Sequence, residues 1–146
     1  MSEPAAERRF VVLRHHPGPA FTRSSEVHFD WMFERGGQLL TWSTVPSDLT
    51  ELNEREWRCV PLAPHRLHYL DYEGAVSGDR GTVERVISGV YLPRDTGDSD
   101  LTASLHWEAS DGPRSAEVKI YRSLDCASDA SAEEIRTSLT LRFSPG

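Results

Sequence analysis

One stretch of the sequence alternates strictly along its length, and this pattern constrains the fold more than any other feature. From Glu26 to Phe33, large apolar residues occupy every second position. A period of two residues is that of a β-strand with one face packed on a core. Gly36 and Gly37 follow and can adopt the positive φ angles of a tight turn, so residues 38–44 are expected to return as the hairpin partner. The residues expected on the second face of the first strand are Glu26, His28, Asp30 and Met32.

Short apolar runs bounded by proline, glycine, aspartate or serine recur along the rest of the chain. They cover residues 9–14, 57–62, 67–72, 82–88, 90–92, 101–107, 116–122 and 137–143. The runs 101–107 and 116–122 flank Ser110-Asp111-Gly112-Pro113 and are expected to form a second hairpin. Such runs are typical of strands, and helical turns are expected only within 47–56 and 129–135. Many short strands predict an all-β fold. The expected form is a small, closed or partly open antiparallel β-barrel with short helical turns in loops, because closing a sheet removes exposed edges.

Length and composition agree with one globular domain over residues 1–146, with a frayed polar segment at 1–8. Of the 146 residues, 38% are hydrophobic, which is enough for a core. No run approaches the roughly 18 apolar residues of a membrane helix, and no signal peptide is recognised at the start, so we expect a cytoplasmic protein without a membrane partner. Cys59 and Cys126 lack CxxC partners, which indicates reduced, structural thiols.

The charge balance limits the binding partners. The chain has 16 basic and 23 acidic residues, a net charge of −7 with neutral histidine. This excess of negative charge opposes nonspecific binding to nucleic acid, so any nucleic-acid contact must be local. Fifteen of the sixteen basic residues are arginine. Because a guanidinium can hold a phosphate with two hydrogen bonds, local phosphate recognition remains open.

His28 and Asp30 form the clearest candidate for chemistry. Two residues apart on a strand, their side chains leave the same face about 7 Å apart. An imidazole nitrogen and a carboxylate oxygen suit a divalent transition metal such as Mn, Fe or Zn. The same pair is also compatible with an ordinary polar strand face. The candidates for further ligands are His15 or His16, and His65 or His68.

Five short motifs follow one another between residues 9 and 92. They are Phe10 to His15, Val27 to Asp30, Leu40 to Trp42, His65 to Gly74, and Gly81 to Val83. In this order they resemble the 3′-phosphoesterase domain of bacterial DNA ligase D. That family has a strand ending in histidine, then His-Tyr-Asp-Phe-Arg, a tryptophan-containing strand, His-Pro-Leu-Asp-Tyr-x-x-Phe-Glu-Gly and Gly-Thr-Val. The chain resembles a stand-alone, divergent member of the family.

The resemblance implies a β-barrel that holds a divalent ion, most often manganese, with zinc or iron as alternatives. Carried over position by position, the metal-binding and catalytic residues are His15, His28, Asp30 and His65. His16 is the alternative first ligand, because the family spacing is shorter than the 13 positions between His15 and His28.

The implied reaction is hydrolysis of a phosphate ester at a nucleic-acid 3′ end, which removes a 3′-phosphate or a 3′-terminal ribonucleoside. A bound metal ion assists such reactions by polarising the phosphoryl oxygen and activating water. The nearest candidates for binding the phosphate are Arg14, Arg66 and Arg80. A smaller phosphate ester is the alternative substrate for an acidic protein, and DNA-repair proteins are the implied partners.

Two further hypotheses belong to other classes. Met32 occupies the position of a family arginine and Ser47 that of a lysine, which favours a catalytically impaired module that binds metal or a DNA-repair protein. His28, Asp30 and His65 also match the two-histidine, one-carboxylate triad of non-haem iron oxygenases.

Overall fold

The computed structural model describes residues 7–19, 27–44, 55–76, 80–94, 100–126 and 133–143. The secondary structure of this part of the chain is almost entirely β. The strands are β1 (Arg8–Pro17), β2 (His28–Arg35), β3 (Gln38–Thr44), β4 (Arg55–His65), β5 (Gly74–Ala75), β6 (Gly81–Pro93), β7 (Leu101–Ala109), β8 (Gly112–Cys126) and β9 (Glu133–Phe143). A single-turn 3₁₀ helix, η1 (Leu67–Leu70), lies between β4 and β5. No helix in the described residues is long and apolar enough to span a membrane.

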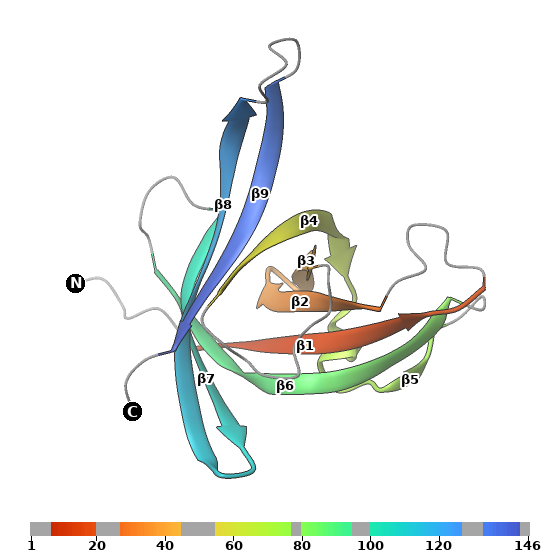
Figure 1. The fold of residues 1–146 in the computed structure, drawn as a ribbon. Coiled ribbons are helices and arrows are strands. Elements are labelled where there is room, and N and C mark those ends of the chain that lie inside the picture. The colour runs from red at the N-terminus through yellow and green to blue at the C-terminus, as the bar shows by residue number, and fades with distance from the viewer. Residues whose placement is uncertain are drawn as a thin grey trace.

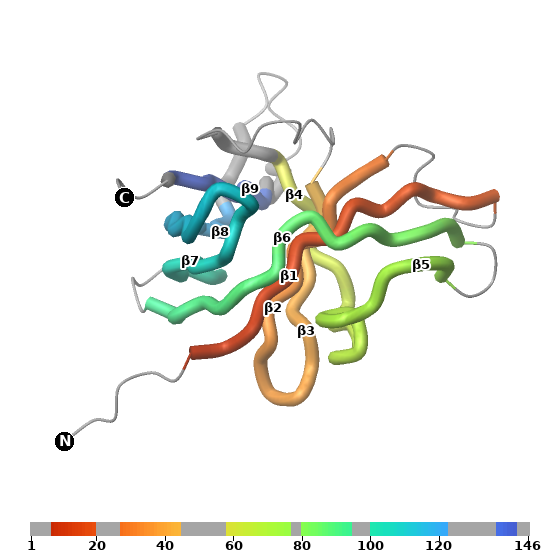
Figure 2. The backbone as a smooth tube through the Cα atoms, turned by 90° about the horizontal axis from the view of Figure 1, so that it is seen from below, coloured from red at the N-terminus to blue at the C-terminus, as the bar shows by residue number. Residues whose placement is uncertain are grey.

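Eight strands form a closed antiparallel barrel (Figure 1). Their order is β1-β2-β3-β4-β9-β8-β7-β6, and the pairing of β1 with β6 closes the ring. β6 is long enough to pair with β7 near its end and with the short strand β5 at its start. The predicted all-β barrel is therefore confirmed, in its closed form. In Figure 2, β1, β6 and β5 run side by side, and the other end of β6 lies next to β7.

The two hairpins that the sequence predicts are present. β2 and β3 pair in register around Gly36 and Gly37, whose φ angles of 61° and 79° lie in the left-handed region. β7 and β8 pair from Ala109 and Gly112 onward, so the turn falls within the expected serine-aspartate-glycine-proline segment. In both cases turn residues and flanking alternation act together, which is the strongest local signal for a hairpin.

Other expected elements need correction. The run 67–72 is not a strand but begins with η1, in which the Tyr69 amide donates to the Arg66 carbonyl and the Asp71 amide to the His68 carbonyl. A run this short fits either period, so tertiary packing decides between them.

The runs 82–88 and 90–92 form one strand, because Gly89 continues β6 instead of turning. Residues 55–56 and 133–135 are strand and not helix. The rest of 47–56 and of 129–135 lies outside the described residues. Of the segment expected to be frayed, residues 1–6 also lie outside them, whereas residues 7 and 8 are described and residue 8 begins β1.

All eight barrel strands contribute to one hydrophobic cluster in the interior. Phe33 packs against three other aromatic rings of this cluster, with its ring centroid 6.1 Å from that of Phe10, 5.9 Å from that of Trp42 and 5.3 Å from that of Tyr91. The expected apolar row of β2 is therefore core. Cys59 belongs to this cluster as a free thiol, and burial raises its pKa to about 12. This agrees with the predicted reduced, structural thiol.

A second, smaller cluster packs on the opposite face of β1, β2 and β3. Its buried members are Val11, Leu13, Met32, Leu39, Leu70 and Val83. The segment from η1 to β5 covers this face, with Tyr69, Tyr72 and Val76 packed against it. The face of β2 that alternation marks as polar is therefore buried as well, and Met32 is only 1% exposed. This cover creates the environment of the candidate site.

A bulge in β6 lets one strand serve both clusters. Val12 pairs with Ile87 but Leu13 pairs with Arg85, so Val86 is the extra residue. An inserted residue reverses which face the following side chains take. Accordingly Val83 belongs to the outer cluster and Ile87 to the interior one.

Candidate metal centre

Three of the residues expected to bind a metal converge on one point between β1 and β2. His15 lies directly opposite His28 in the strand pair, and Asp30 is two residues further along β2. Because side chains on a strand alternate, all three project from the face that carries the outer cluster. They are buried, with exposed fractions of 6% for His15, 1% for His28 and 4% for Asp30. The sequence thus predicts this grouping, but not its burial.

The ligand atoms are close enough to share one cation. His15 Nδ1 lies 3.0 Å from His28 Nε2. Asp30 Oδ1 lies 3.5 Å from His28 Nε2, and Asp30 Oδ2 lies 3.9 Å from His15 Nδ1. One ligand atom from each residue falls within 4.8 Å of the other two. Ligand atoms that each bind one ion at about 2.1 Å are roughly 3 Å apart, so a small contraction would suffice.

A backbone carbonyl sets the tautomer of His15. Its Nε2 lies 2.8 Å from the carbonyl oxygen of Arg80, which can only accept a hydrogen bond. Nε2 therefore carries the proton, and in a neutral imidazole the Nδ1 lone pair faces His28 and Asp30. Metal-binding histidines are commonly oriented by such a carbonyl partner. His15 therefore has the tautomer and the ring orientation that a metal ligand requires.

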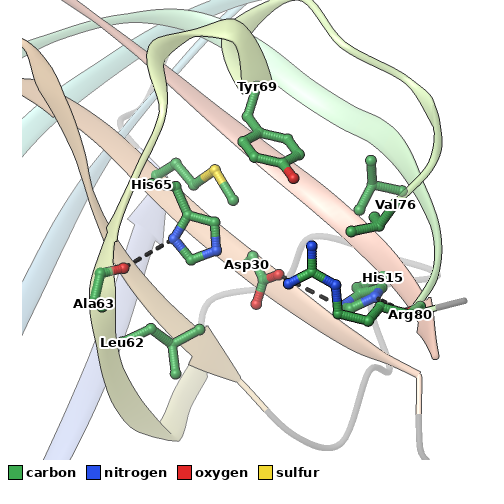
Figure 3. A pocket seen from close by; sticks show the side chains of 10 residues that line it. His15, Asp30, Leu62, Ala63, His65, Tyr69, Val76 and Arg80 are labelled. Atoms are coloured by element: carbon green, nitrogen blue, oxygen red, sulfur yellow. Dashed lines mark hydrogen bonds and ion pairs between the residues drawn. The ribbon is translucent and has the colours of Figure 1, made fainter. Parts of the chain in front are cut away.

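Two of the three residues, His15 and Asp30, line a pocket of about 330 Å³, shown in Figure 3. His65 and Tyr69 line the same pocket. The Nδ1 atom of His65 donates to the Ala63 carbonyl at 2.9 Å, so in the neutral ring Nε2 holds the lone pair. His65 is partly exposed and does not belong to the compact three-residue group. It shares the pocket with that group but is not gathered into it.

The alternative first ligand, His16, does not join the group. His16 is exposed, whereas its neighbour His15 is buried beside His28. Adjacent residues of a strand point to opposite faces, so only one of the two can lie on the face of Asp30. Of the remaining histidines, His68 lies on η1 and His106 on β7.

The three arginines expected to bind phosphate occupy different places. Arg80 lines the pocket, and its side chain extends into it (Figure 3). Arg66 lines an adjoining pocket. Arg14 instead pairs with Glu84 at 2.6 Å and lies over the ring of Phe29, so it does not face the group of ligands. Arg80 is therefore the arginine best placed beside the candidate metal centre.

One residue of the pocket, Tyr69, is not anticipated from the sequence. The Tyr69 ring lies 5.7 Å from that of His65, because η1 brings it back over the pocket. Tyr69 follows His65 by four residues in the same motif, which could have indicated that both residues lie at the pocket. The strand expected over 67–72 did not predict this. Met32 lines the pocket where the resemblance predicts an arginine, so this wall is apolar.

The comparisons with known proteins add no family. No protein-family model matches the chain, and no curated protein matches it. We therefore infer a function from the geometry of this site and from the resemblance of the five motifs.

Proposed function

We propose that this protein is a divalent-metal-dependent phosphoesterase that acts on nucleic-acid 3′ ends and removes a 3′-phosphate or a 3′-terminal ribonucleoside. The observation that carries the proposal is the buried group of His15, His28 and Asp30, whose ligand atoms lie within 4.8 Å of one another beside a pocket. The five ordered motifs support the choice of reaction and substrate.

The chemistry of the ligand set fits a divalent transition metal. Two imidazole nitrogens and one carboxylate are a usual combination for Mn, Fe or Zn, and the resemblance favours manganese. Burying a carboxylate is costly unless a positive charge or hydrogen bonds compensate it. A cation between Asp30 and the two histidines would supply that compensation. Such an ion provides Lewis-acid activation of a phosphoryl oxygen and of water.

The chain's own residues would orient and enclose the phosphate. The backbone carbonyl of Arg80 orients the His15 ring. The guanidinium of Arg80 would donate hydrogen bonds to phosphate oxygens and would place a positive charge beside them. Leu62 and Val76 line the pocket together with Met32, so its walls are largely apolar. Apolar walls exclude water and strengthen the electrostatic interactions inside the pocket.

A phosphate-release assay with a 3′-phosphorylated oligonucleotide tests the proposal. We expect release by the protein loaded with Mn²⁺, none after chelation, and a loss of at least about 100-fold in Asp30→Asn, as when an electrostatic catalytic group is removed. His106→Ala is the matched control, because His106 is exposed on β7 and lines neither pocket beside the candidate centre. Activity that survives chelation, or that Asp30→Asn retains, would refute the proposal.

One observation favours a second candidate, a metal-binding module of the same fold without turnover. Met32, 1% exposed, lies in the pocket where an arginine would be expected to neutralise phosphate charge. This candidate predicts that the protein binds Mn²⁺ but releases no phosphate, and that Met32→Arg, if it folds, gains no activity.

A further inference from the structure

A second pocket, of about 500 Å³, adjoins the candidate metal centre. The proposed hydrolysis leaves it without a role. The two pockets share His65, Tyr69 and Arg80 among their lining residues, so a molecule bound at the metal centre can extend directly into the second pocket. Its outer part is formed by Arg66, by η1 and by Tyr72, which follows η1.

Aromatic rings run from the metal centre into this second pocket. The ring of His65 lies 5.7 Å from that of Tyr69, and the rings of Tyr69 and His68 lie 4.2 Å apart with planes inclined by 32°. The Tyr72 ring lies 5.9 Å from that of Tyr69, and its hydroxyl donates to the Ala75 carbonyl. Rings that are already held in place lose little entropy on binding a planar ligand.

The outermost ring is accessible. The imidazole of His68 lies against the Tyr69 ring and meets the Tyr72 ring edge-on, with ring centroids 5.5 Å apart, yet His68 is exposed. Its exposed surface can therefore receive a further planar group, which would continue the series of rings.

The second pocket is positively charged although the protein is acidic overall. Arg66 and Arg80 line it, and none of the described residues in its lining is Asp or Glu. The two acidic residues of the covering segment pair elsewhere, Asp71 with Arg9 at 2.7 Å and Glu73 with Arg85 at 3.7 Å. A ligand that combines a planar ring with phosphate groups matches both features of this pocket.

We propose that the second pocket is a stacking subsite for the 3′-terminal base of a single-stranded nucleic acid, with His68 and Tyr72 as the stacking residues and Arg66 near the backbone phosphate on the 5′ side of that nucleotide. The inference deepens the proposed function and rests on it, because the terminal phosphate would occupy the metal centre. Stacking of bases on aromatic side chains tolerates any base, so the subsite would select single-stranded ends and not a sequence.

Binding of a single-stranded DNA with a 3′-hydroxyl and a terminal 2-aminopurine tests this inference. Such an end has neither a 3′-phosphate nor a ribonucleoside to lose, so binding is measured without turnover. We expect quenching of the 2-aminopurine fluorescence by the wild-type protein. Kd should rise about 5- to 150-fold in His68→Ala, the range found when a stacking side chain is removed. His68→Phe should restore binding, and His106→Ala should bind as wild type does.

An oligonucleotide with an abasic 3′ terminus separates stacking from charge. It should bind more weakly than the base-ended DNA and equally to wild type and His68→Ala. The inference is overturned if His68→Ala and Tyr72→Leu both bind the base-ended DNA as tightly as wild type does. Quenching that persists in a protein without phosphatase activity would keep the subsite and reject the hydrolysis. Equal kcat/KM for base-ended and abasic 3′-phosphates in an active enzyme would keep the hydrolysis and reject the subsite.

Discussion

Gly89 is a position in β6 where the barrel leaves no room for a side chain. The strand passes between β1 and β7 there, pairing with Phe10 on one side and Trp107 on the other. A Cβ at this position would collide with the His106 carbonyl and lie 2.8 Å from the Trp107 Cβ. Since backbone atoms cannot rotate away as a flexible side chain can, the strands themselves would have to separate.

Gly89→Ala should therefore destabilise the protein by about 1–3 kcal/mol, the usual cost of overpacking. Urea unfolding followed by tryptophan fluorescence measures the change in the free energy of unfolding. Ser88→Ala, at the next position and only partly buried, should change it by less than about 0.5 kcal/mol. Equal stability of wild type and Gly89→Ala would show that this close approach is not a constraint.

Single residues of the site were predictable only in part. The spacing of His28 and Asp30 places both on one face of a strand, which the structure bears out. The choice between His15 and His16 could not be made from sequence, because it depends on the register of β1 against β2. The Arg80 carbonyl that orients His15 is a backbone group, so no residue type signals it.

At the level of elements, two ion pairs attach the segment from η1 to β5 to the barrel. Arg9 on β1 pairs with Asp71 at 2.7 Å, and Arg85 on β6 pairs with Glu73 at 3.7 Å. The hydrogen bond from Arg9 lowers the pKa of Asp71 below its ordinary value of 3.8. A lowered pKa in the folded protein means that the charged pair stabilises the fold above pH 3.8. That contribution is lost as the pH falls through the folded value.

Asp71→Asn should accordingly lower stability at pH 6 but not at the acid end of the range. The measurement is the free energy of unfolding of wild type and variant between pH 2 and pH 7, at low salt because exposed pairs are screened. The two curves should be separated at pH 6 and meet below the folded pKa. Glu108→Gln, an exposed carboxylate on β7, serves as the control. Curves that stay equally far apart at every pH would rule out this role for the pair.

The wrong predictions of secondary structure share a physical cause. Residues 67–72 look like a strand because apolar residues recur there, but the 3₁₀ turn buries Leu70 against the outer cluster while Leu67 stays 37% exposed. Residues 82–92 look like two strands because glycine usually marks a turn. Here Gly89 serves a close approach of strands instead. The 3₁₀ turn and the uninterrupted strand both depend on contacts with residues far away in the sequence.

At the scale of the whole molecule, one barrel wall has two buried faces. The interior cluster stabilises the closed barrel, and the outer cluster under η1 and β5 buries the three candidate ligands. The all-β class and antiparallel pairing were predictable, because alternation and turn residues are local. Closure through β1 and β6 and the bulge at Val86 were not, because they depend on pairing between segments some 70 residues apart.

We propose that His15, His28 and Asp30 together bind one divalent ion. Calorimetric titration of the chelator-treated protein with Mn²⁺, Zn²⁺ and Fe²⁺ is the decisive experiment. We expect one ion per chain in wild type and in His106→Ala. Affinity should fall at least about 100-fold in His28→Ala and in Asp30→Asn, since even residues that only orient ligands contribute 10- to 100-fold. A wild-type protein that binds none of the three ions, or variants that bind as tightly as wild type does, would contradict it.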